Sequence, residues 1–335
     1  MSKIIGGRTI EFENVYIHSF AAVGGKKEGE GPLSKYFDKI FYDEYLKEKS
    51  FEKAESMLQK SALEIALKKG NLNPENIGAL FAGDLLNQCI GSSFGLRDFG
   101  IPFVGLYGAC STMALSIGVA STFIDAKALK TAASITSSHF CSSERQFRFP
   151  LEYGSVRTPT AQWTATASGA VILTDAKTHL RVAKYTPGKL VDLGVKDANN
   201  MGAAMAPAAA DTILKFFEDT HISPENYDKI FTGDLGIVGT RLLHEILMGE
   251  GLNIEKRHAD CGKLLFDPQT ADVHAGASGC GCVGSTLAGM ILRKMTDGEY
   301  KRVLVCGTGA LLSTVSTSQG ETIPCVAHLI EIEKA

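Results

Sequence analysis

Several features of other protein classes are missing from this chain. No apolar run approaches the roughly 20 residues that a membrane-spanning helix needs, so we expect a soluble chain. The formal net charge is −3, which argues against the basic face that binds nucleic acid. No Walker phosphate-binding loop occurs, and we expect no cofactor. Paired Cys-x-x-Cys motifs are also absent, so we expect the eight cysteines to be reduced thiols without a structural metal.

The most informative positive feature is a self-match at a spacing of 150 residues. Residues 71–85 read NLNPENIGALFAGDL and residues 221–235 read HISPENYDKIFTGDL, with seven identical positions. Such a repeat means that one supersecondary unit occurs twice in the chain. The match also places Asp84 and Asp234 at equivalent ends of two predicted strands.

The repeat extends to neighbouring segments, which show the periodicities of helices and strands. The paired segments are 51–72 with 208–222, 103–126 with 271–295, and 130–139 with 301–313. Alternating helices and continuous apolar strands are typical of a largely parallel sheet covered by helices. We therefore expect a five-layered α/β fold with its layers in the order αβαβα.

The duplication divides the chain into an N-terminal half, residues 1–176, and a C-terminal half, residues 177–335. Insertions near 25–50 and 140–165 break the symmetry between the halves. The first insertion is charged and aromatic, and the second has three arginines among aromatic residues. Either insertion could cover a site or form a dimer surface.

Cys110 is the strongest candidate for a functional residue. It lies in the segment Tyr107-Gly-Ala-Cys-Ser-Thr112, where small residues allow a sharp turn from a strand into a helix. The dipole at a helix N-terminus favours a thiolate, which predicts a lowered pKa for Cys110. Ser111 or Thr112 could cap the helix. The alternative is that Cys110 is a small apolar residue that fits the bend.

Several strings taken together resemble known families. The repeated half, the turn Ala-Cys-Ser-Thr at 109–112, the strand ASGAVIL at 167–173 and the string GTGALLS at 307–313 resemble the thiolase-like condensing enzymes. The strings FAGDLLNQ, SERQFRFPLEYG, MGAAMAPAAADT and HADCGKLLF resemble the stage V sporulation AD family of endospore-forming bacteria. The first resemblance implies the thiolase-like fold over essentially the whole chain. The second implies a role in the uptake of dipicolinic acid into spores.

The chain departs from condensing enzymes of the ketoacyl-synthase III type where catalysis requires a partner for the thiol. Those enzymes have a histidine after the strand equivalent to 227–232, and this chain has Thr232-Gly-Asp234 there. Their asparagine lies in a turn that reads Gly276-Ala-Ser-Gly279 in this chain. A thiol without a base is a weak nucleophile at neutral pH. We therefore expect no catalytic residue and a cavity that is used for binding.

Dipicolinate is a planar dianion, and a protein that binds it should present positive charge or hydrogen-bond donors. Arg145 and Arg148 could hold its carboxylates, or could pair with Glu144 at a subunit contact. The turn with Thr308 and Gly309 matches the oxyanion-hole loop of condensing enzymes, whose backbone donors would also suit a carboxylate. The residues predicted to bind the ligand, with no metal ligand among them, are Asp84, Asn87, Cys110, Ser111, His139, Arg145, Arg148, Asp234, Ser278, Thr308 and Gly309.

Some of these residues have a plain structural alternative. Asp84 and Asp234 could line a pocket, or could accept backbone N–H bonds in their own turns. Asn87 could be a solvated loop residue. His139 ends a predicted strand, where ligands gather in open α/β sheets, but it could also be a hydrogen-bonded histidine at a strand end. For His274, we expect a partly exposed histidine in a turn, and the alternative is a place in the pocket.

The leading hypothesis is a non-catalytic protein that binds dipicolinic acid, free or as its calcium chelate, and passes it to membrane subunits of the spore transport system. The alternative is an acyltransferase with Cys110 as nucleophile and His139 or His274 as base. A third hypothesis is a scaffold that contacts the membrane subunits through the insertion at 140–165. The resemblance also implies a homodimer, located in the cytoplasm or spore core and peripheral on the spore inner membrane through its partners.

Overall fold

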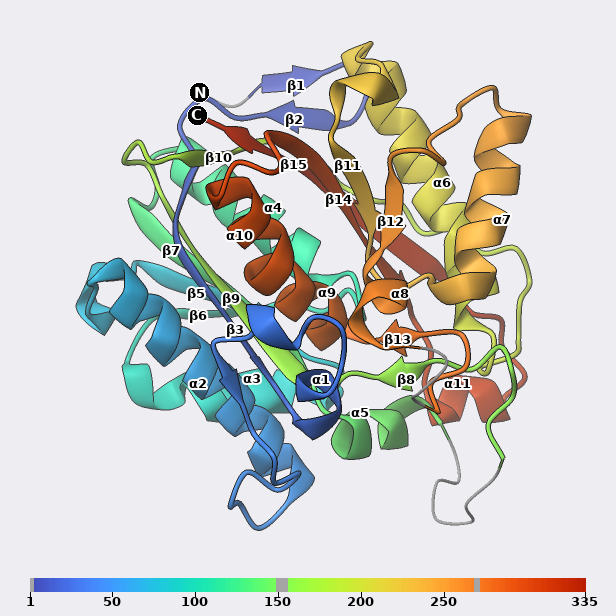
Figure 1. The fold of residues 1–335 in the computed structure, drawn as a ribbon, viewed down its shortest axis with the longest axis horizontal. Helices are drawn as coiled ribbons and strands as arrows, with labels where there is room; N and C mark the ends of the chain where they lie inside the picture. The colour runs from blue at the N-terminus through green and yellow to red at the C-terminus, as the bar shows by residue number, and fades with distance from the viewer. Residues whose placement is uncertain (1–2, 149–155, 268–271) are drawn as a thin grey trace.

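The computed structural model describes residues 3–148, 156–267 and 272–335. Two runs of strands form its centre, and they repeat the same arrangement (Figure 1). The strands of the first run are β3 (Tyr16–Gly24), β5 (Ala79–Gly83), β6 (Phe103–Gly105), β7 (Thr131–Ser138) and β9 (Ala167–Thr174). The strands of the second run are β10 (Leu180–Thr186), β11 (Lys229–Thr232), β12 (His258–Asp260), β14 (Arg302–Ala310) and β15 (Cys325–Lys334).

The order of strands shows the duplication directly. The first run lies in the order β6-β5-β7-β9-β3, and the second lies in the order β12-β11-β14-β15-β10. In each run the first two neighbouring pairs are parallel and the next two are antiparallel. A single residue pair, Arg181 with Tyr16, joins β10 to β3 and connects the two runs.

The expectation of a largely parallel sheet is therefore wrong for half of the strand pairs. Strands β9 and β15 are buried along almost their whole length, because helices cover both faces of the sheet. A continuous apolar sequence reports this burial and carries no information on strand direction.

Helices form three layers around the two runs (Figure 1). The outer helices are α2 (Phe51–Gly70) and α3 (Ile90–Leu96) on the first run, and α6 (Met201–Thr220) and α7 (Gly236–Gly249) on the second. The central layer consists of α4 (Thr112–Asp125) and the continuous segment α9 (Cys280–Thr286), η7 (Leu287–Ile291) and α10 (Leu292–Thr296). Helix α4 packs on β5 and β7 from one side and on β14 and β15 from the other. The predicted five-layered, duplicated fold is confirmed.

The repeated sequence 71–85/221–235 forms the same local structure twice. Asn71 caps the C-terminus of helix α2 and His221 caps that of α6, and both residues have left-handed backbone angles, with φ of 52° and 54°. Each is followed by a short 3₁₀ turn, η2 (Pro74–Asn76) or η6 (Pro224–Asn226), which leads into β5 or β11. The left-handed residue ends each helix, and the proline is the first residue of each 3₁₀ turn.

The first residues of the chain pack on the second run of strands. β1 (Lys3–Ile5) pairs with β2 (Thr9–Glu11), and β2 pairs with β10. The carboxylate of Asp219, near the end of α6, accepts hydrogen bonds from the backbone N–H groups of Gly7, Arg8 and Thr9 at 2.7–2.9 Å. The N-terminal segment is therefore fixed by a helix more than 200 residues away in sequence.

The two insertions lie against each other. The remaining short elements are α1 (Lys26–Gly29), η1 (Ser34–Tyr36), β4 (Lys39–Ile40), η3 (Asn87–Cys89), η4 (Arg97–Phe99), α5 (Phe140–Phe147), β8 (Trp163–Thr164), α8 (Cys261–Leu265), β13 (Ala277–Ser278) and α11 (Thr314–Ser318). Helix α1 belongs to the first insertion, and α5 and β8 belong to the second.

Among the described residues, no helix has both the length and the apolar character needed to cross a membrane.

Candidate functional site

The turn that holds Cys110 is tight and strained. Ala109 has a φ of 49°, which is unusual for a residue with a side chain. The hydroxyl of Ser111 donates to the Gly108 carbonyl at 2.6 Å, so it is used in the turn and does not cap α4. A Cβ at position 309 would lie 2.3 Å from the Gly108 oxygen, so only glycine allows β14 to pass this close to the turn.

The thiol of Cys110 is only 5% exposed, and its sulfur lies 3.8 Å from the hydroxyl of Ser278. Burial raises the pKa of Cys110 well above its ordinary value, and the neighbouring carboxylate of Asp234 raises it further. The expected lowering of this pKa by the helix N-terminus is wrong, because desolvation and a nearby negative charge outweigh the dipole. Cys110 therefore sits in this protein as a neutral thiol.

Asp234 is the polar centre of this site. Its Oδ2 accepts hydrogen bonds from the Ser278 hydroxyl at 2.8 Å and from the Gly279 N–H at 2.9 Å. Its Oδ1 accepts a bond from the Thr308 hydroxyl at 2.7 Å. The side chain is completely buried, and burial raises its pKa although these hydrogen bonds oppose the shift. The structure thus brings together four of the residues that we predicted to bind a ligand: Cys110, Asp234, Ser278 and Thr308.

Two residues that the sequence analysis missed hold this arrangement in place. Gln162 donates from Nε2 to the carbonyl oxygen of Asp234 at 2.6 Å. Asp260 accepts hydrogen bonds from the N–H groups of Leu235 and Gly236, at 2.9 and 3.0 Å, and burial raises its pKa to about 6. The position of Asp260 before the short helix α8, where its side chain also accepts from the Lys263 N–H, was the signal that could have revealed it as a cap.

Asp84 has the environment of a turn residue. Its Oδ1 accepts from the Leu86 N–H at 2.9 Å, and its Oδ2 accepts from the N–H and hydroxyl of Ser92 at 2.7 and 2.5 Å. Glu55 on α2 is a second buried carboxyl near it, with a pKa raised to about 8 by burial and by the charge of Asp84. Asn87 is exposed. These contacts are the structural alternative that the sequence left open for Asp84.

The two arginines that were predicted to hold carboxylates have acidic partners. Arg145 forms an ion pair with Glu52 on α2, and Arg148 forms one with the fully buried Glu144 at 2.6 Å. Arg157 also approaches Glu144, at 3.5 Å. The Glu144–Arg148 pair is the alternative to ligand binding that the sequence suggested, and in the structure it lies within one chain.

Both candidate bases have other contacts. The Nε2 of His139 lies 2.8 Å from the Glu44 carbonyl, and its Nδ1 accepts from the Cys141 N–H at 3.2 Å. Burial lowers the pKa of His139, which keeps the ring neutral. His274 is partly exposed and its Nε2 lies 2.9 Å from the exposed Asp272. It is the turn histidine that the sequence predicts.

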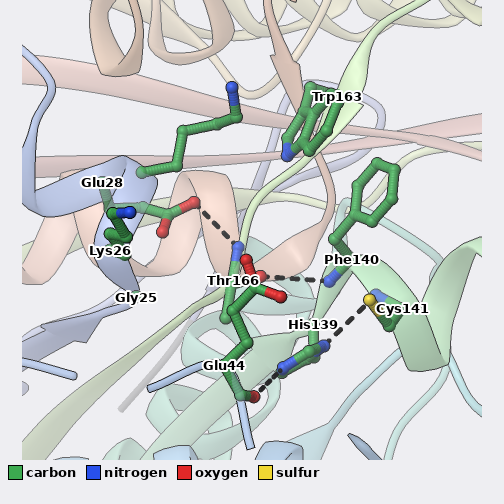
Figure 2. A pocket seen from close by; sticks show the side chains of 10 residues that line it. Gly25, Lys26, Glu28, Glu44, His139, Phe140, Cys141, Trp163 and Thr166 are labelled. Carbon is green, nitrogen blue, oxygen red and sulfur yellow. Dashed lines mark hydrogen bonds between the residues drawn. The ribbon is translucent and has the colours of Figure 1, made fainter. Parts of the chain in front are cut away.

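A separate cavity of about 200 Å³ lies between the two insertions, and we call it the insertion pocket (Figure 2). Its lining residues come from both insertions, from the residue after β7 and from the residue before β9: Gly25, Lys26, Lys27, Glu28, Glu44, His139, Phe140, Cys141, Trp163 and Thr166. Of the predicted ligand-binding residues, only His139 lines it. Both insertions were predicted as possible covers of a site, but no motif in the sequence indicated this cavity.

Comparison with known proteins decides the family. The family model of stage V sporulation protein AD matches residues 6–333. The stage V sporulation protein AD of Bacillus subtilis (strain 168) is 41% identical over 334 residues, which covers 99% of this chain and 98% of that protein. The chain belongs to the stage V sporulation protein AD family. The resemblance that the sequence strings indicated is confirmed.

Solved structures show which fold this sporulation family shares. The 3-oxoacyl-[acyl-carrier-protein] synthase III of Aquifex aeolicus matches with a TM-score of 0.59 at 12% identity, covering 95% of this chain and 99% of that one. A cysteine-to-alanine variant of OleA from Xanthomonas campestris matches with a TM-score of 0.61 at 14% identity, covering 96% and 98%. A cysteine-to-serine variant of OleA, solved with bound lauric acid and lauroyl-CoA, has a TM-score of 0.58 at 14% identity, covering 96% and 99%. The chain thus has the thiolase-like fold.

Proposed function

We propose that this protein is a non-catalytic binding protein built on the fold of condensing enzymes. Its ligand is dipicolinic acid, free or as the calcium chelate, which it binds for uptake into the developing spore. It works with membrane proteins of the same transport system, and it lies in the spore core, peripheral on the inner membrane through these partners. Membership of a sporulation family supports the biological setting, and the chemistry around Cys110 supports the lack of catalysis.

The lack of catalysis is supported chiefly by the group that lies next to the Cys110 thiol. Nucleophilic cysteines require a base or a positive charge that favours the thiolate. In this chain the group next to Cys110 is the carboxylate of Asp234, and it raises the pKa of the thiol. Both oxygens of Asp234 accept hydrogen bonds from Ser278, Gly279 and Thr308. This arrangement suits a stable interior better than acyl transfer.

Calorimetric titration of the purified protein with dipicolinate, with and without calcium, tests the proposed ligand. Saturable binding is expected, and the comparison of the two titrations shows which form is preferred. The absence of saturable heat from the wild-type protein in both titrations would end the proposal.

Acylation of Cys110 tests the lack of catalysis. Incubation with long-chain acyl-CoA, followed by mass spectrometry of the peptide that contains Cys110, is expected to show an unmodified thiol. A stable acyl adduct at Cys110 that is absent from the Cys110→Ala variant would support the acyltransferase alternative.

We further propose that the protein is a homodimer that pairs through β6. This strand ends its run and leaves one edge without a partner strand among the described residues. Its residues are exposed, and apolar side chains surround the edge, with Phe94 55%, Tyr107 50% and Phe103 41% exposed. An exposed apolar edge strand is a template for pairing with another chain. Light scattering should give the mass of a dimer for the wild type and of a monomer for Phe103→Pro, since proline removes the Phe103 N–H, which faces the free edge and does not pair with β5.

A further inference from the structure

The insertion pocket contains a buried polar group that lacks a partner. Glu28 is 1% exposed, and its Oε1 accepts from the Thr166 N–H at 2.9 Å (Figure 2). Its Oε2 is buried and has no hydrogen-bond partner among the described residues. Buried polar atoms are nearly always hydrogen-bonded, so an unpaired oxygen in the wall of a cavity is available to a water or a ligand there.

The protonation state of Glu28 determines what this oxygen can bind. Burial raises the pKa of Glu28 to about 7, although the N–H groups of Thr166, Glu28 and Gly25 and the charge of Lys27 lower it in part. The carboxyl is therefore substantially protonated near neutral pH, and a protonated carboxyl donates a hydrogen bond. The other titratable groups that line the pocket are Lys26 and Lys27 from α1, Glu44 from the first insertion, and His139 and Cys141 at the start of α5.

The rest of the pocket offers positive charge and aromatic surface. The ammonium of Lys27 lies 4.3 Å from the centroid of the Trp163 ring and 5.9 Å from that of Phe266. The Trp163 and Phe140 rings stack with centroids 4.0 Å apart and an interplanar angle of 17°. Cation–π contact holds the ammonium at the wall, and the stacked rings make that wall rigid.

The size of the cavity limits the ligand. Its volume of about 200 Å³ is below the 300–1,000 Å³ that is usual for drug-sized ligands. At ~30 Å³ for each water, it has room for about six or seven waters, which corresponds to one small ring with its substituents. A long acyl chain or a nucleotide would extend beyond this space.

We propose that the insertion pocket binds a small planar aromatic acid, with the Lys27 ammonium as counter-charge, the Glu28 carboxyl as hydrogen-bond donor and the Trp163–Phe140 stack as the apolar wall. This inference rests on the proposed function, since dipicolinate is an acid of this class. It places the ligand between the insertions and assigns the surroundings of Cys110 to the structural interior.

Trp163 makes this proposal directly testable, because it is the only tryptophan in the chain. Titration of the wild-type protein with dipicolinate is followed by calorimetry and by Trp163 fluorescence, excited where the ligand does not absorb. Both signals should saturate with the same dissociation constant. Binding heat without any change in Trp163 emission would overturn the pocket assignment and leave the proposed function intact, whereas no binding heat would remove both.

Variants then separate the two regions. Lys27→Met should weaken binding roughly 10- to 100-fold, because a charge-assisted contact of about 1.5–3 kcal/mol is lost. Lys35→Met, which removes a lysine that contacts the Tyr36 ring outside the pocket, is the matched control and should bind like the wild type. If Lys27→Met binds like the wild type while Cys110→Ala loses affinity, the ligand lies at Cys110 and the pocket assignment is wrong.

Changes of pH and of ligand identify the donor and the chemistry. Wild-type affinity should fall as the pH rises through 7, because the donor proton of Glu28 is lost, whereas Glu28→Gln should keep a donor and show a flatter profile. An equally steep profile in Glu28→Gln would contradict the role of Glu28. Benzoate and pyridine-2-carboxylate should compete with dipicolinate if a planar carboxylate is the recognised group, and failure of both would contradict it.

Discussion

The buried carboxyl group near Cys110 and the one in the insertion pocket differ in whether their oxygens have hydrogen-bond partners. At Cys110, both oxygens of Asp234 have hydrogen-bond partners, from two segments of the chain. In the insertion pocket, one oxygen of Glu28 has none among the described residues, and positive charge and aromatic rings lie beside it. A satisfied buried network stabilises one structure, whereas an unsatisfied group beside a cavity is suited to a ligand. Likeness to an enzyme fold therefore need not place the binding site where the enzymes have their cysteine.

The largest expected effect is the loss of stability in Asp234→Ala. The change leaves the donors of Ser278, Gly279 and Thr308 without their acceptor in the interior. We expect the free energy of unfolding to fall by roughly 3–5 kcal/mol, measured by urea denaturation. Asp84→Ala, at the equivalent strand end, should cost a similar amount. A loss below about 1 kcal/mol in Asp234→Ala would contradict a structural role for this network.

In contrast to Asp234→Ala, Glu28→Gln should be more stable than the wild type above neutral pH. The carboxyl ionises at a pKa of 4.5 in the unfolded chain but only at about 7 in the folded protein. Between these values the unfolded state releases its proton first, so wild-type stability falls as the pH rises. The loss reaches roughly 3 kcal/mol above pH 7, and Glu28→Gln should not show it. Parallel stability profiles of the two proteins from pH 4 to 9 would show that Glu28 does not titrate in this way.

Asp234→Asn should make Cys110 more reactive. The carboxylate is the second cause of the raised pKa of Cys110, so its neutralisation lowers that pKa. The larger thiolate fraction should increase the rate of alkylation at neutral pH. The rate is measured by mass spectrometry of the Cys110 peptide, which separates it from the partly exposed Cys141. Asp84→Asn is the control and should leave the rate unchanged.

The smallest expected effect is that of Ala109→Gly. Ala109 has a φ of 49°, and the left-handed region costs a residue with a side chain about 1–2 kcal/mol. Glycine removes this strain but adds about 0.5–1 kcal/mol of entropy to the unfolded chain. We expect stability to rise by less than about 1 kcal/mol in thermal unfolding. A clear loss of stability would mean that the Ala109 methyl group packs usefully in the turn.

The sequence predicted the fold because the duplication is visible in it. The Pro-Glu-Asn turns and the Phe-x-Gly-Asp-Leu strand ends of 71–85 and 221–235 identify equivalent elements without any structure. Strand direction was not accessible, because β9 and β15 are buried on both faces and their sequences show only burial.

The candidate site was predictable only in part. The grouping of Cys110, Asp234, Ser278 and Thr308 followed from matched positions around a known kind of turn. The pKa of Cys110 did not, since it depends on burial and on a carboxylate 124 residues away in sequence. The insertion pocket could not be predicted from the sequence either. Glu28 and Trp163 lie in different insertions, and no repeat or motif connects them.

The anchoring of the N-terminal segment on Asp219 has a consequence for synthesis of the chain. Gly7, Arg8 and Thr9 leave the ribosome before their acceptor, Asp219 at the end of α6, which emerges more than 200 residues later. Contacts of this separation form late and slowly. The strand pair β1–β2 therefore has no surface to pack on during most of translation. The N-terminal segment docks on α6 and β10 only when the second half folds.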